Sequence, residues 1–293
     1  MAPTSGATLA FEPRVTDASA ALTGLCLQNG ALRRYQSEWC RSEYTLPELY
    51  ETFAAHVVEW SILGRDRPWQ SVHTHFRKGA ELSPNQKQKF YESGETHVST
   101  AMRQLENRHG KIGPEASILD FGCGLGRLAL AFARRPFARV VCVDQSIHHL
   151  RRARLEILGI DASAAARIAY AVSTPDLLGA LRGERFDVVH SVIAIQHMAA
   201  PLQTVYLEQL CDALRPGGRG WIQIPTNVSH MSREETCDMS ISEGQGGMQM
   251  HYTPIEHIGR SLRRRGCEPS FEAPAARYVS PKFTDTVVLL RKH

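Results

Sequence analysis

The sequence predicts an α/β fold, a doubly wound and mainly parallel sheet with an N-terminal helical cap. Three observations lead to this prediction. From residue 113 onward short apolar runs alternate with amphipathic helices, a glycine-rich loop follows the first of these runs, and residues 1–112 show helical patterning. We therefore expect a helical cap that helps to form a substrate site over 1–112, and a sheet domain over 113–293.

The N-terminal region has the periodicity of helices. Between Leu46 and Trp60 the apolar residues recur at spacings of three and four, which places them on one helical face. A second helix is expected over 84–108, and no clear alternating strand pattern precedes residue 113. The region is therefore predicted to be a helical cap.

The C-terminal region alternates strands with helices, which implies right-handed crossovers and helices on both faces of the sheet. The sequence Thr253-Pro254-Ile255-Glu256 has the form of a capping box with proline at the first helical position. Strands are expected over 117–120, 138–143, 167–172, 186–193, 221–224 and 283–290, and helices over 127–135, 148–158, 202–214 and 253–265.

The glycine loop Asp120-Phe121-Gly122-Cys123-Gly124-Leu125-Gly126 gives the strongest functional signal. Its glycines let the backbone approach a ligand closely and turn directly into a helix. A dinucleotide fingerprint would place a third glycine at position 127, where this chain has Arg127, and the Gly-Lys-Ser/Thr of a P-loop does not follow. Asp120 would repel a pyrophosphate but suits a ligand that carries an ammonium group.

A carboxylate ends the next apolar run, Val140-Val141-Cys142-Val143-Asp144. In nucleotide-binding sheets of this kind, an acid about 20 residues after the glycine loop accepts hydrogen bonds from ribose hydroxyls. An acid at a strand end is otherwise most often a helix cap. Its distance from the glycine loop favours the ligand role.

Taken in order, ILDFGCGLGRLALAFA, VVCVDQS, FDVVHSVIAIQH and LRPGGRGWIQIP resemble the successive motifs of class I S-adenosylmethionine-dependent methyltransferases. The resemblance covers residues 114–293. It implies a Rossmann-like methyltransferase fold of seven strands, with the last strand antiparallel, and S-adenosyl-L-methionine as cofactor. It also implies that the glycines border the methionine part, that Asp144 holds the ribose, and that Gln145 and Ser146 lie beside the adenine.

Two further cofactor contacts follow from the resemblance. The family often has an acid at the end of the third strand, but here Asp176 is displaced, and Ser173 or Thr174 is expected to take its place. Tyr91 stands where similar methyltransferases have a residue that reaches or covers the cofactor; an aromatic anchor for the cap is the equal alternative. The implied contacts are Tyr91, Asp120, Gly122, Cys123, Gly124, Gly126, Asp144, Gln145, Ser146, Thr174, Ser191 and Val192.

The fourth-strand segment is expected to face both cofactor and substrate. It has neither the Asn-Pro-Pro-Tyr of adenine or glutamine methylation nor the Pro-Cys of cytosine methylation. His197 is a candidate general base, since an imidazole pKa of about 6.5 suits proton removal from a hydroxyl or amine. Alternatively, it caps the next helix or hydrogen-bonds within the core. The candidate substrate contacts are Gln196, His197, His251 and Tyr252.

The segment 226–252 is polar and contains Gly244, Gly246 and Gly247. A connection of this length is usually functional or disordered. We interpret it as a lid insertion that closes over the acceptor together with the N-terminal cap. A flexible surface loop is the alternative.

Composition excludes several classes of protein. No apolar run reaches the roughly 18 residues that span a membrane, and the first twenty residues lack a basic region followed by an apolar one, so a cytoplasmic protein is expected. The seven cysteines form no CxxC pair and are expected to be reduced thiols. No histidine spacing indicates a metal site, and a net charge of +4 falls short of a nucleic-acid-binding protein.

The expected function is methyl transfer from S-adenosyl-L-methionine to an O, N or C nucleophile of a small molecule, such as a compound of specialised metabolism. The sulfonium methyl is already activated, so alignment and water exclusion are the main tasks and no metal is needed. Two alternatives stay open, namely methylation of protein or RNA, and a non-catalytic adenosylmethionine-binding role. The sequence is compatible with a homo-oligomer.

Overall fold

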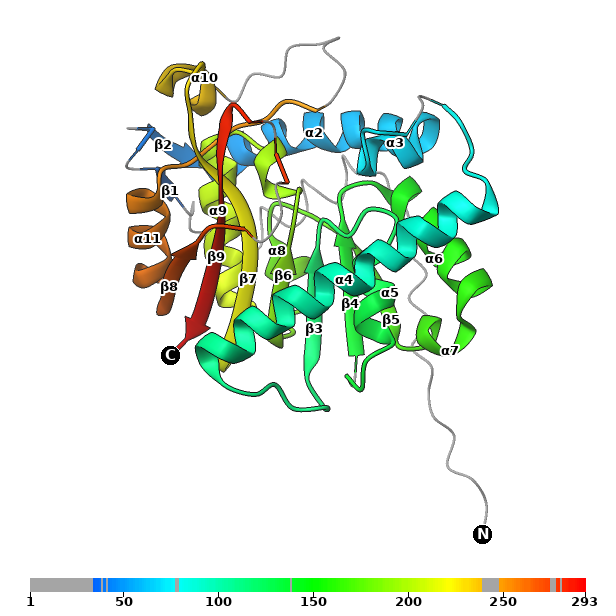
Figure 1. The fold of residues 1–293 in the computed structure, drawn as a ribbon. Coiled ribbons are helices and arrows are strands. Elements are labelled where there is room, and N and C mark those ends of the chain that lie inside the picture. Colours follow the sequence, from blue (N-terminus) through cyan, green and yellow to red (C-terminus); the bar gives the residue numbers. More distant parts are fainter. Residues whose placement is uncertain are drawn as a thin grey trace. The chain divides into compact units, whose positions relative to one another are not determined.

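A seven-stranded sheet organises the part of the chain that the computed structural model describes, which comprises residues 34–37, 39–40, 42–76, 79–137, 139–238, 248–274, 278–279 and 281–293. The strand order is β5-β4-β3-β6-β7-β9-β8, with β3 to β7 parallel and β9 antiparallel to both of its neighbours (Figure 1). The predicted seven-stranded, mainly parallel sheet is therefore confirmed. The strands are β3 (Ser117–Phe121), β4 (Arg139–Asp144), β5 (Ile168–Val172), β6 (Phe186–Ser191), β7 (Leu214–Val228), β8 (Cys267–Glu272) and β9 (Phe283–Lys292).

Both faces of the sheet are buried, because successive residues of a strand point to opposite sides. Ile118 and Leu119 of β3 lie in different core clusters, and so do Val188 and Val189 of β6. Near-continuous apolar runs are what a sheet covered on both faces requires. One face carries α4 (Pro84–His109), α5 (Arg127–Ala133), α6 (Ile147–Ile160) and α7 (Ala162–Ala165), and the other carries α8 (Leu177–Ala180), α9 (Ala200–Asp212) and α11 (Ile255–Arg264).

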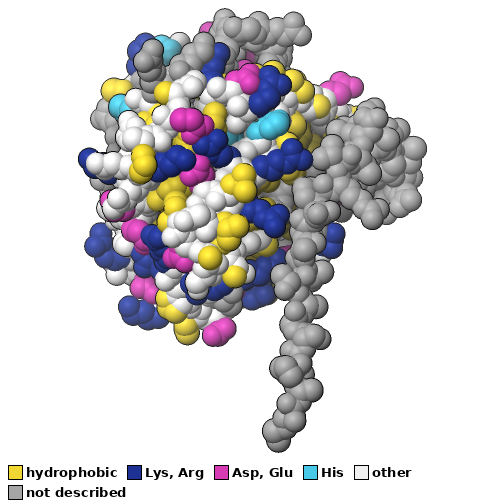
Figure 2. All heavy atoms as spheres, turned by 90° about the vertical axis from the view of Figure 1, so that its right-hand side faces the viewer, with side chains coloured by type: hydrophobic (Ala, Val, Ile, Leu, Met, Phe, Trp, Pro, Cys, Tyr) yellow, Lys and Arg dark blue, Asp and Glu magenta, His cyan; other side chains and the backbone are white. Residues whose placement is uncertain are grey.

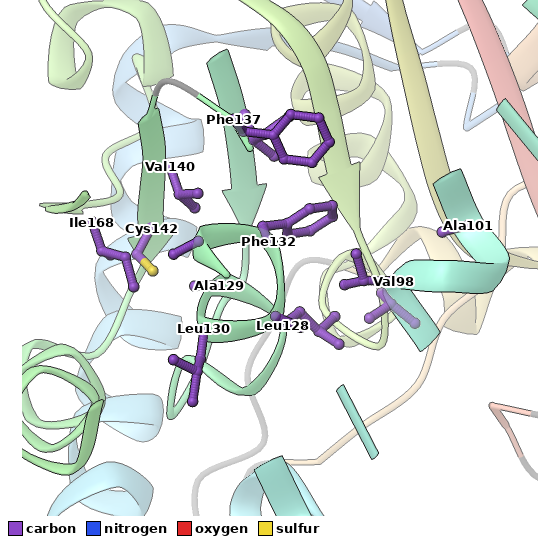
Figure 3. Close-up of a cluster of buried hydrophobic side chains, with 14 of the residues drawn as sticks. Val98, Ala101, Leu128, Ala129, Leu130, Phe132, Phe137, Val140, Cys142 and Ile168 are labelled. Atoms are coloured by element: carbon purple, nitrogen blue, oxygen red, sulfur yellow. The ribbon is translucent and has the colours of Figure 1, made fainter. Parts of the chain in front are cut away.

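Helix α5 is buried along its whole length. Leu128, Leu130 and Phe132 lie among side chains of α4 and of the sheet (Figure 3), and the alanines between them let these layers approach closely. Each buried leucine or phenylalanine contributes about 1.5–3 kcal/mol relative to an exposed one. This packing fixes the start of α5, and with it the glycine loop that precedes the helix.

Helices α2 (Leu46–Asp66) and α3 (Pro68–Val72) lie across the edge of the sheet at which the parallel strands end (Figure 1, top). Thr45 begins α2 in a capping box with Glu48, which satisfies two backbone N–H groups that have no partner within the helix. Trp69 of α3 is 1% exposed, and its indole N–H donates to Glu81 at 3.2 Å. The described part of the N-terminal region is thus a helical cap, as its periodicity predicts.

The cap also contains strands that the sequence pattern did not predict. β1 (Arg34–Ser37) and β2 (Ser42–Thr45) form an antiparallel hairpin. In the seven-stranded sheet, β8 is also a strand that the sequence pattern does not predict. Pro269 and the two glutamates of CEPSFE obscure the alternation of apolar and polar residues.

Two predicted boundaries around the segment 226–252 are wrong. β7 continues to Val228, so its first three residues belong to the sheet, and the helix α10 (Arg233–Cys237) follows. Thr253 does not cap α11, because its hydroxyl donates to Gln203 at 2.7 Å and Pro254 stands at the N-cap without a side-chain bond. The glycines predicted as hinges, residues 244, 246 and 247, lie outside the described residues.

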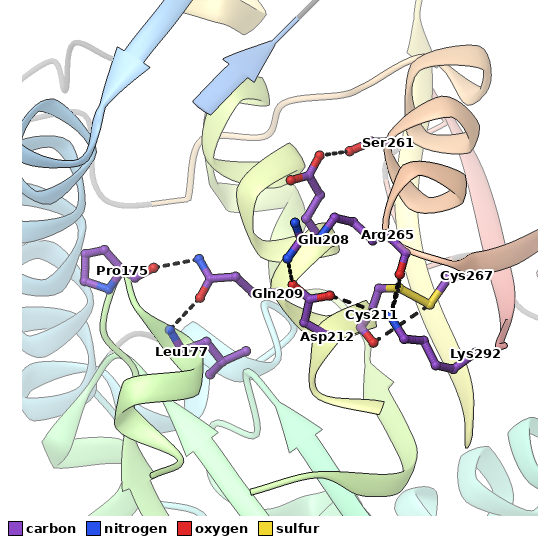
Figure 4. A network of polar contacts seen from close by, with 10 residues as sticks. All are labelled: Pro175, Leu177, Glu208, Gln209, Cys211, Asp212, Ser261, Arg265, Cys267 and Lys292. Atoms are coloured by element: carbon purple, nitrogen blue, oxygen red, sulfur yellow. Dashed lines mark hydrogen bonds and ion pairs between the residues drawn. A yellow bond between two sulfur atoms is a disulfide. The ribbon is translucent and has the colours of Figure 1, made fainter. Parts of the chain in front are cut away.

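The expectation of reduced cysteines is wrong for four of the seven. Disulfides join Cys40 to Cys237 and Cys211 to Cys267, across sequence separations of 197 and 56 residues. Such distant partners leave no spacing signature that a sequence could show. The second disulfide links α9 to β8. Next to it, Lys292 donates to the Arg265 carbonyl. On α9 as well, Gln209 accepts from the backbone N–H of Leu177 at 2.5 Å (Figure 4).

The surface beside α6 mixes charged and apolar groups. Leu155, Leu158 and Ile160 are exposed there, and Figure 2 shows apolar side chains interspersed with those of lysines and arginines. From this side the described residues form no continuous basic stripe of the kind that follows a nucleic-acid backbone. No helix among the described residues has the length and hydropathy needed to cross a membrane.

Candidate functional site

A cavity opens at the carboxyl ends of β3, β4 and β6. The glycine loop forms one wall, and the residues that follow β4 and β6 form two others. Trp60 of α2 and Val72 of α3 complete the enclosure, so the N-terminal cap does cover the cavity. Doubly wound sheets bind their ligands at this edge.

The glycine loop is held by one backbone carbonyl and shaped by close contacts. The N–H groups of Gly122 and Cys123 both donate to the Val143 carbonyl, at 2.7 and 3.0 Å. Gly122 has a φ of +74°, and a β-carbon there would overlap that of Ala194. A β-carbon on Gly124 would lie 2.7 Å from a methyl carbon of Val72. The loop therefore touches the cap directly, and Gly126 serves as the N-cap of α5 outside the cavity wall.

Asp144 faces the cavity while two of its lone pairs are fixed by the backbone. Its Oδ2 accepts from the N–H of Gly124 and its Oδ1 from that of Ser146, both at 2.8 Å. Ser146 is fully buried and caps α6, so its predicted place beside a ligand is wrong. Gln145, by contrast, lines the cavity as expected.

Among the buried polar atoms at or next to the cavity wall that have no hydrogen-bond partner, three belong to residues named as candidate contacts. They are Oδ2 of Asp120, Oε1 of Gln145 and Oγ of Ser191. Asp120 is 2% exposed and Ser191 is fully buried, and leaving such atoms unpaired costs about 1–3 kcal/mol each. All three were candidate contacts from the sequence, and a polar ligand is the simplest way to satisfy them.

A chain of hydrogen bonds stands behind Asp120. His190 Nδ1 lies 3.0 Å from Asp120 Oδ1, His190 Nε2 lies 2.9 Å from His97 Nε2, and His97 Nδ1 lies 3.1 Å from the Tyr278 hydroxyl. Burial, His190 and Arg127 lower the pKa of His97 to about 2, so this imidazole is neutral. With Asp120 ionised, each group of the chain donates toward the carboxylate. His190 is therefore a buried member of this chain of hydrogen bonds.

Of the two places expected for Tyr91, the structure agrees with the aromatic anchor, because Tyr91 does not line the cavity. It is 3% exposed, and its hydroxyl donates to the Leu125 carbonyl at 3.1 Å behind the glycine loop. The neighbouring Phe90 lines the cavity instead, together with Arg127. Burial lowers the pKa of this guanidinium, which nevertheless stays charged at neutral pH. An anionic group of a ligand could therefore pair with Arg127.

The wall after β5 and β4 includes one of the two residues expected there. Ser173 lines the cavity, whereas the Thr174 hydroxyl donates to the Asp176 carbonyl at 2.7 Å and points away. His149 of α6 is 1% exposed and also lines the cavity. Its Nε2 lies 2.8 Å from the Ser71 hydroxyl, which joins α6 to the cap helix α3.

His197 lines the cavity opposite the glycine loop and beside Trp60, with ring centres 5.1 Å apart. Its Nδ1 lies 2.9 Å from the Gln249 carbonyl, which can only accept, so Nδ1 carries the proton. Burial lowers its pKa to about 4, opposed by this hydrogen bond and assisted by His251. In neutral His197 the Nε2 atom is therefore unprotonated.

The other candidate substrate contacts support this wall without lining it. Gln196 accepts from Gln223 at 3.2 Å, and its carbonyl accepts from the N–H of His251 at 2.7 Å. His251 is 6% exposed, and Tyr252 is held by the Thr236 hydroxyl through both its N–H and its carbonyl. The described residues contain no group of three His, Cys, Asp or Glu that could hold a metal ion.

Known proteins share this arrangement. A family model described as a methyltransferase domain matches residues 118–218, which include the glycine loop, Asp144 and His197. The chain is 38% identical over 162 residues to the ubiquinone biosynthesis O-methyltransferase of Ruegeria pomeroyi, across 52% of this chain and 60% of that protein. Residues 118–218 therefore form a methyltransferase domain.

Other similarities agree at the level of the domain and the fold. A second ubiquinone biosynthesis O-methyltransferase, from Parvibaculum lavamentivorans, is 29% identical over 170 residues, and the match spans 57% of each chain. The magnesium protoporphyrin IX methyltransferase of Synechocystis PCC 6803, solved with bound SAH, superposes with a TM-score of 0.57 at 14% identity, and the match covers 83% of this chain and 100% of that chain. The chain thus spans about 60% of the length of the sequence relatives.

Several cavity residues were not predicted as ligand contacts. Among them, Trp60 and Val72 come from the cap, and Arg127 is the first residue of the helix after the glycine loop. Because Arg127 follows directly after that loop, the first turn of the helix was the available signal. Nothing in the local pattern distinguishes Trp60 and Val72 from core residues of an amphipathic helix.

Proposed function

We propose that this methyltransferase binds S-adenosyl-L-methionine in the cavity and methylates a hydroxyl group of a small, partly apolar molecule. The observation that carries the proposal is His197, which lines the same cavity as the glycine loop and Asp144. Its Nδ1 donates to the Gln249 carbonyl, so Nε2 is an acceptor, with Gln196 Nε2 at 3.4 Å. The names of the sequence relatives, two of which are O-methyltransferases, support a hydroxyl acceptor.

The cavity residues fit the cofactor. Asp144 would accept from the two ribose hydroxyls with the lone pairs that the backbone leaves free, and the unpaired Oε1 of Gln145 would accept from the adenine amine. The unpaired Oδ2 of Asp120 suits the ammonium group, and Arg127 suits the carboxylate. When bound, the cofactor supplies a methyl group activated on a sulfonium sulfur.

The chain itself would orient the acceptor and take up its proton. Trp60, Met198 and Phe90 exclude water and offer apolar surface to the acceptor. His197 Nε2 would accept the hydroxyl proton, while the Gln249 carbonyl stabilises the imidazolium through Nδ1. The described residues 248–252 keep His197 in place, so we propose that the segment 226–252 closes the acceptor side together with the cap.

Incubation with methyl-labelled S-adenosyl-L-methionine tests the proposal most directly. The acceptors would be a panel of catechols and phenols, with matched amines and carboxylic acids. Label in a phenolic ether supports the proposal. Label confined to amines, or to protein or RNA in a cell extract, would reject a small hydroxyl acceptor. Tight cofactor binding with no transfer to any metabolite of the extract would favour a non-catalytic role.

Asp144→Ala should weaken binding of S-adenosylhomocysteine by about 1.5–3 kcal/mol, the scale of hydrogen bonds to a charged group. The substitution also removes the acceptor for the N–H groups of Gly124 and Ser146. Calorimetry measures the change. Asp176→Ala is the matched control, because this exposed carboxylate only caps α8. Equal affinity of both variants would reject the ribose assignment.

His197→Ala should lower kcat about 10²–10⁴-fold if the imidazole is the general base. Affinity for S-adenosylhomocysteine should stay almost unchanged, because the proposed cofactor contacts lie on other residues. Steady-state kinetics with the acceptor identified above gives kcat, and calorimetry gives the affinity. His293→Ala, an exposed histidine at the end of the chain, is the control.

A purely structural His197 would behave differently. The melting temperature would fall strongly, while kcat per folded molecule would stay near that of the unaltered protein. That result would remove the general base from the mechanism.

A further inference from the structure

We propose that Gln223 is a positioning residue of the active site, which holds the turn after β6 in a strained conformation. The inference rests on the proposed function for its kinetic consequence and on the structure alone for its geometry. Gln223 lies on β7, is fully buried and does not line the cavity. Gln223 lies in the motif LRPGGRGWIQIP, but the sequence analysis gives it no contact with the cofactor or the substrate.

The turn after β6 contains an unusual backbone conformation. Ile193 has a φ of +55°, a region that β-branched residues rarely adopt because the side chain meets the backbone. Such conformations persist only where the surroundings enforce them, and they gather at functional sites. Ile193 and Ala194 line the cavity against Gly122, and the N–H of His197 donates to the Ala194 carbonyl at 3.2 Å. The position of His197 therefore depends on this turn.

The side chain of Gln223 is the partner that the turn requires. Ser191 is the last residue of β6 that pairs with β7, opposite Ile222. Gln223 is the next residue of β7, and its Oε1 accepts from the N–H of Ile193 at 2.8 Å. Its Nε2 donates to Gln196 Oε1 at 3.2 Å, so a single amide holds both ends of the turn. Without it the N–H of Ile193 would be left without this acceptor.

Asp285 of β9 fixes which way the amide of Gln223 points. Gln223 Nε2 donates to Asp285 Oδ1 at 2.6 Å, while Asp285 Oδ2 accepts from the N–H of Tyr278 at 2.9 Å. A carboxylate only accepts, so the amide nitrogen must face Asp285 and the amide oxygen must face Ile193. The carboxylate of Asp285 thus sets the hydrogen-bond direction across three neighbouring strands.

Exchanging the acid and the amide gives a sharp test. In Gln223→Glu the new carboxylate still accepts from the N–H of Ile193. Its other oxygen, however, cannot donate to Asp285 Oδ1 and Gln196 Oε1, as the amide nitrogen does. In Asp285→Asn the new amide cannot accept from Tyr278 and from Gln223 at the same time. The double variant Gln223→Glu with Asp285→Asn restores a donor opposite each acceptor between the two side chains at unchanged net charge. Gln196 keeps its Nε2 toward His197 Nε2, 3.4 Å away, so one contact between oxygens, that of the new carboxylate with Gln196 Oε1, remains in the double variant.

Each single variant should lower kcat about 10- to 100-fold, the scale of misplacing a catalytic group by about an ångström. The double variant should recover most of this loss. S-adenosylhomocysteine affinity and melting temperature are measured on the same samples. Recovery of kcat in the double variant supports positioning. Single variants with unchanged kcat, or a double variant as slow as the product of the two losses, would overturn the proposal.

Hydrogen exchange gives a readout that does not need an acceptor. In Gln223→Leu the amide of Ile193 should exchange at least about tenfold faster than in the unaltered protein, because a hydrogen bond that protects it is lost. Gln209→Leu is the control, since Gln209 bridges Pro175 and Leu177 on a different side of the sheet. Unchanged exchange at Ile193 would overturn the geometric part of the inference. A Gln223→Leu variant with fast exchange at Ile193 but unchanged kcat would overturn the kinetic part.

Discussion

Replacing Gly122 with alanine is expected to abolish measurable binding of S-adenosylhomocysteine and to destabilise the fold. The new β-carbon would overlap that of Ala194 and would stand at a φ of +74°. Overpacking costs about 1–3 kcal/mol, and the left-handed conformation adds about 1–2 kcal/mol for a residue with a side chain. Relief of the overlap requires the turn that carries Ala194 to move away from the glycine loop, which opens the cavity.

Thermal unfolding and calorimetry measure the two effects. Gly122→Ala combined with Ala194→Gly should recover part of the stability, because it removes the overlap but not the unfavourable φ. Gly159→Ala is the control, because a β-carbon at that helical position would have no other atom within 4 Å. A Gly122→Ala protein with unaltered melting temperature and affinity would show that the loop and the turn are not in contact.

Acid is expected to destabilise this protein well above the range in which carboxylates titrate. Burial lowers the pKa of His56 and His197 to about 4 and that of His97 to about 2, whereas an unfolded histidine has a pKa of about 6.5. Below pH 6.5 the unfolded chain therefore binds protons that the folded chain does not. Stability is fully present above pH 6.5 and falls as the pH drops.

The expected size follows from the linkage relation. Each of the three histidines contributes about 1.4 kcal/mol per pH unit, so the loss at pH 5.5 is about 4 kcal/mol relative to neutral pH. Melting curves between pH 7.5 and 5 test this. His97→Gln removes one titrating group but keeps a hydrogen-bonding side chain, so its melting temperature should fall less steeply. Equal slopes in both proteins would mean that His97 is accessible to protons in the folded state.

The parts of the site that the sequence predicted are those built from contiguous residues. The glycine loop and Asp144 need only a strand, a turn and the start of a helix, and each leaves a local pattern of residue types. The cap residues Trp60 and Val72 reach the cavity from far along the chain, and their helical periodicity looks the same whether they meet a core or a ligand. Contacts between residues far apart in the sequence produce no local pattern of residue types from which they could be predicted.

The sequence could not show which of two neighbouring residues reaches the cavity, and the physical cause is the same in each case. Phe90 and Tyr91 are adjacent apolar residues of one helix, and the packing of α4 against α5 decides which of them faces the cavity. Ser173 and Thr174 are separated in the same way by the hydrogen bonds of the following turn. Neighbours differ by about 100° around a helix and alternate sides on a strand. A boundary error of one residue therefore reverses which side chain reaches the ligand.

The disulfide between Cys40 and Cys237 turns most of the molecule into a covalent ring. The sequence separation of 197 residues includes the cap helices and all the residues that line the cavity. Fully extended, a chain of that length spans about 650–700 Å. While the disulfide is intact, a force that pulls on the two ends of the protein cannot extend these residues. Part of such a load passes to the pairing of β9 with β7, where a strand outside the ring meets a strand inside it. Another part passes to the disulfide between Cys211 and Cys267, which joins the same two regions covalently. The cavity therefore lies in the part of the chain that a pull on the ends does not extend.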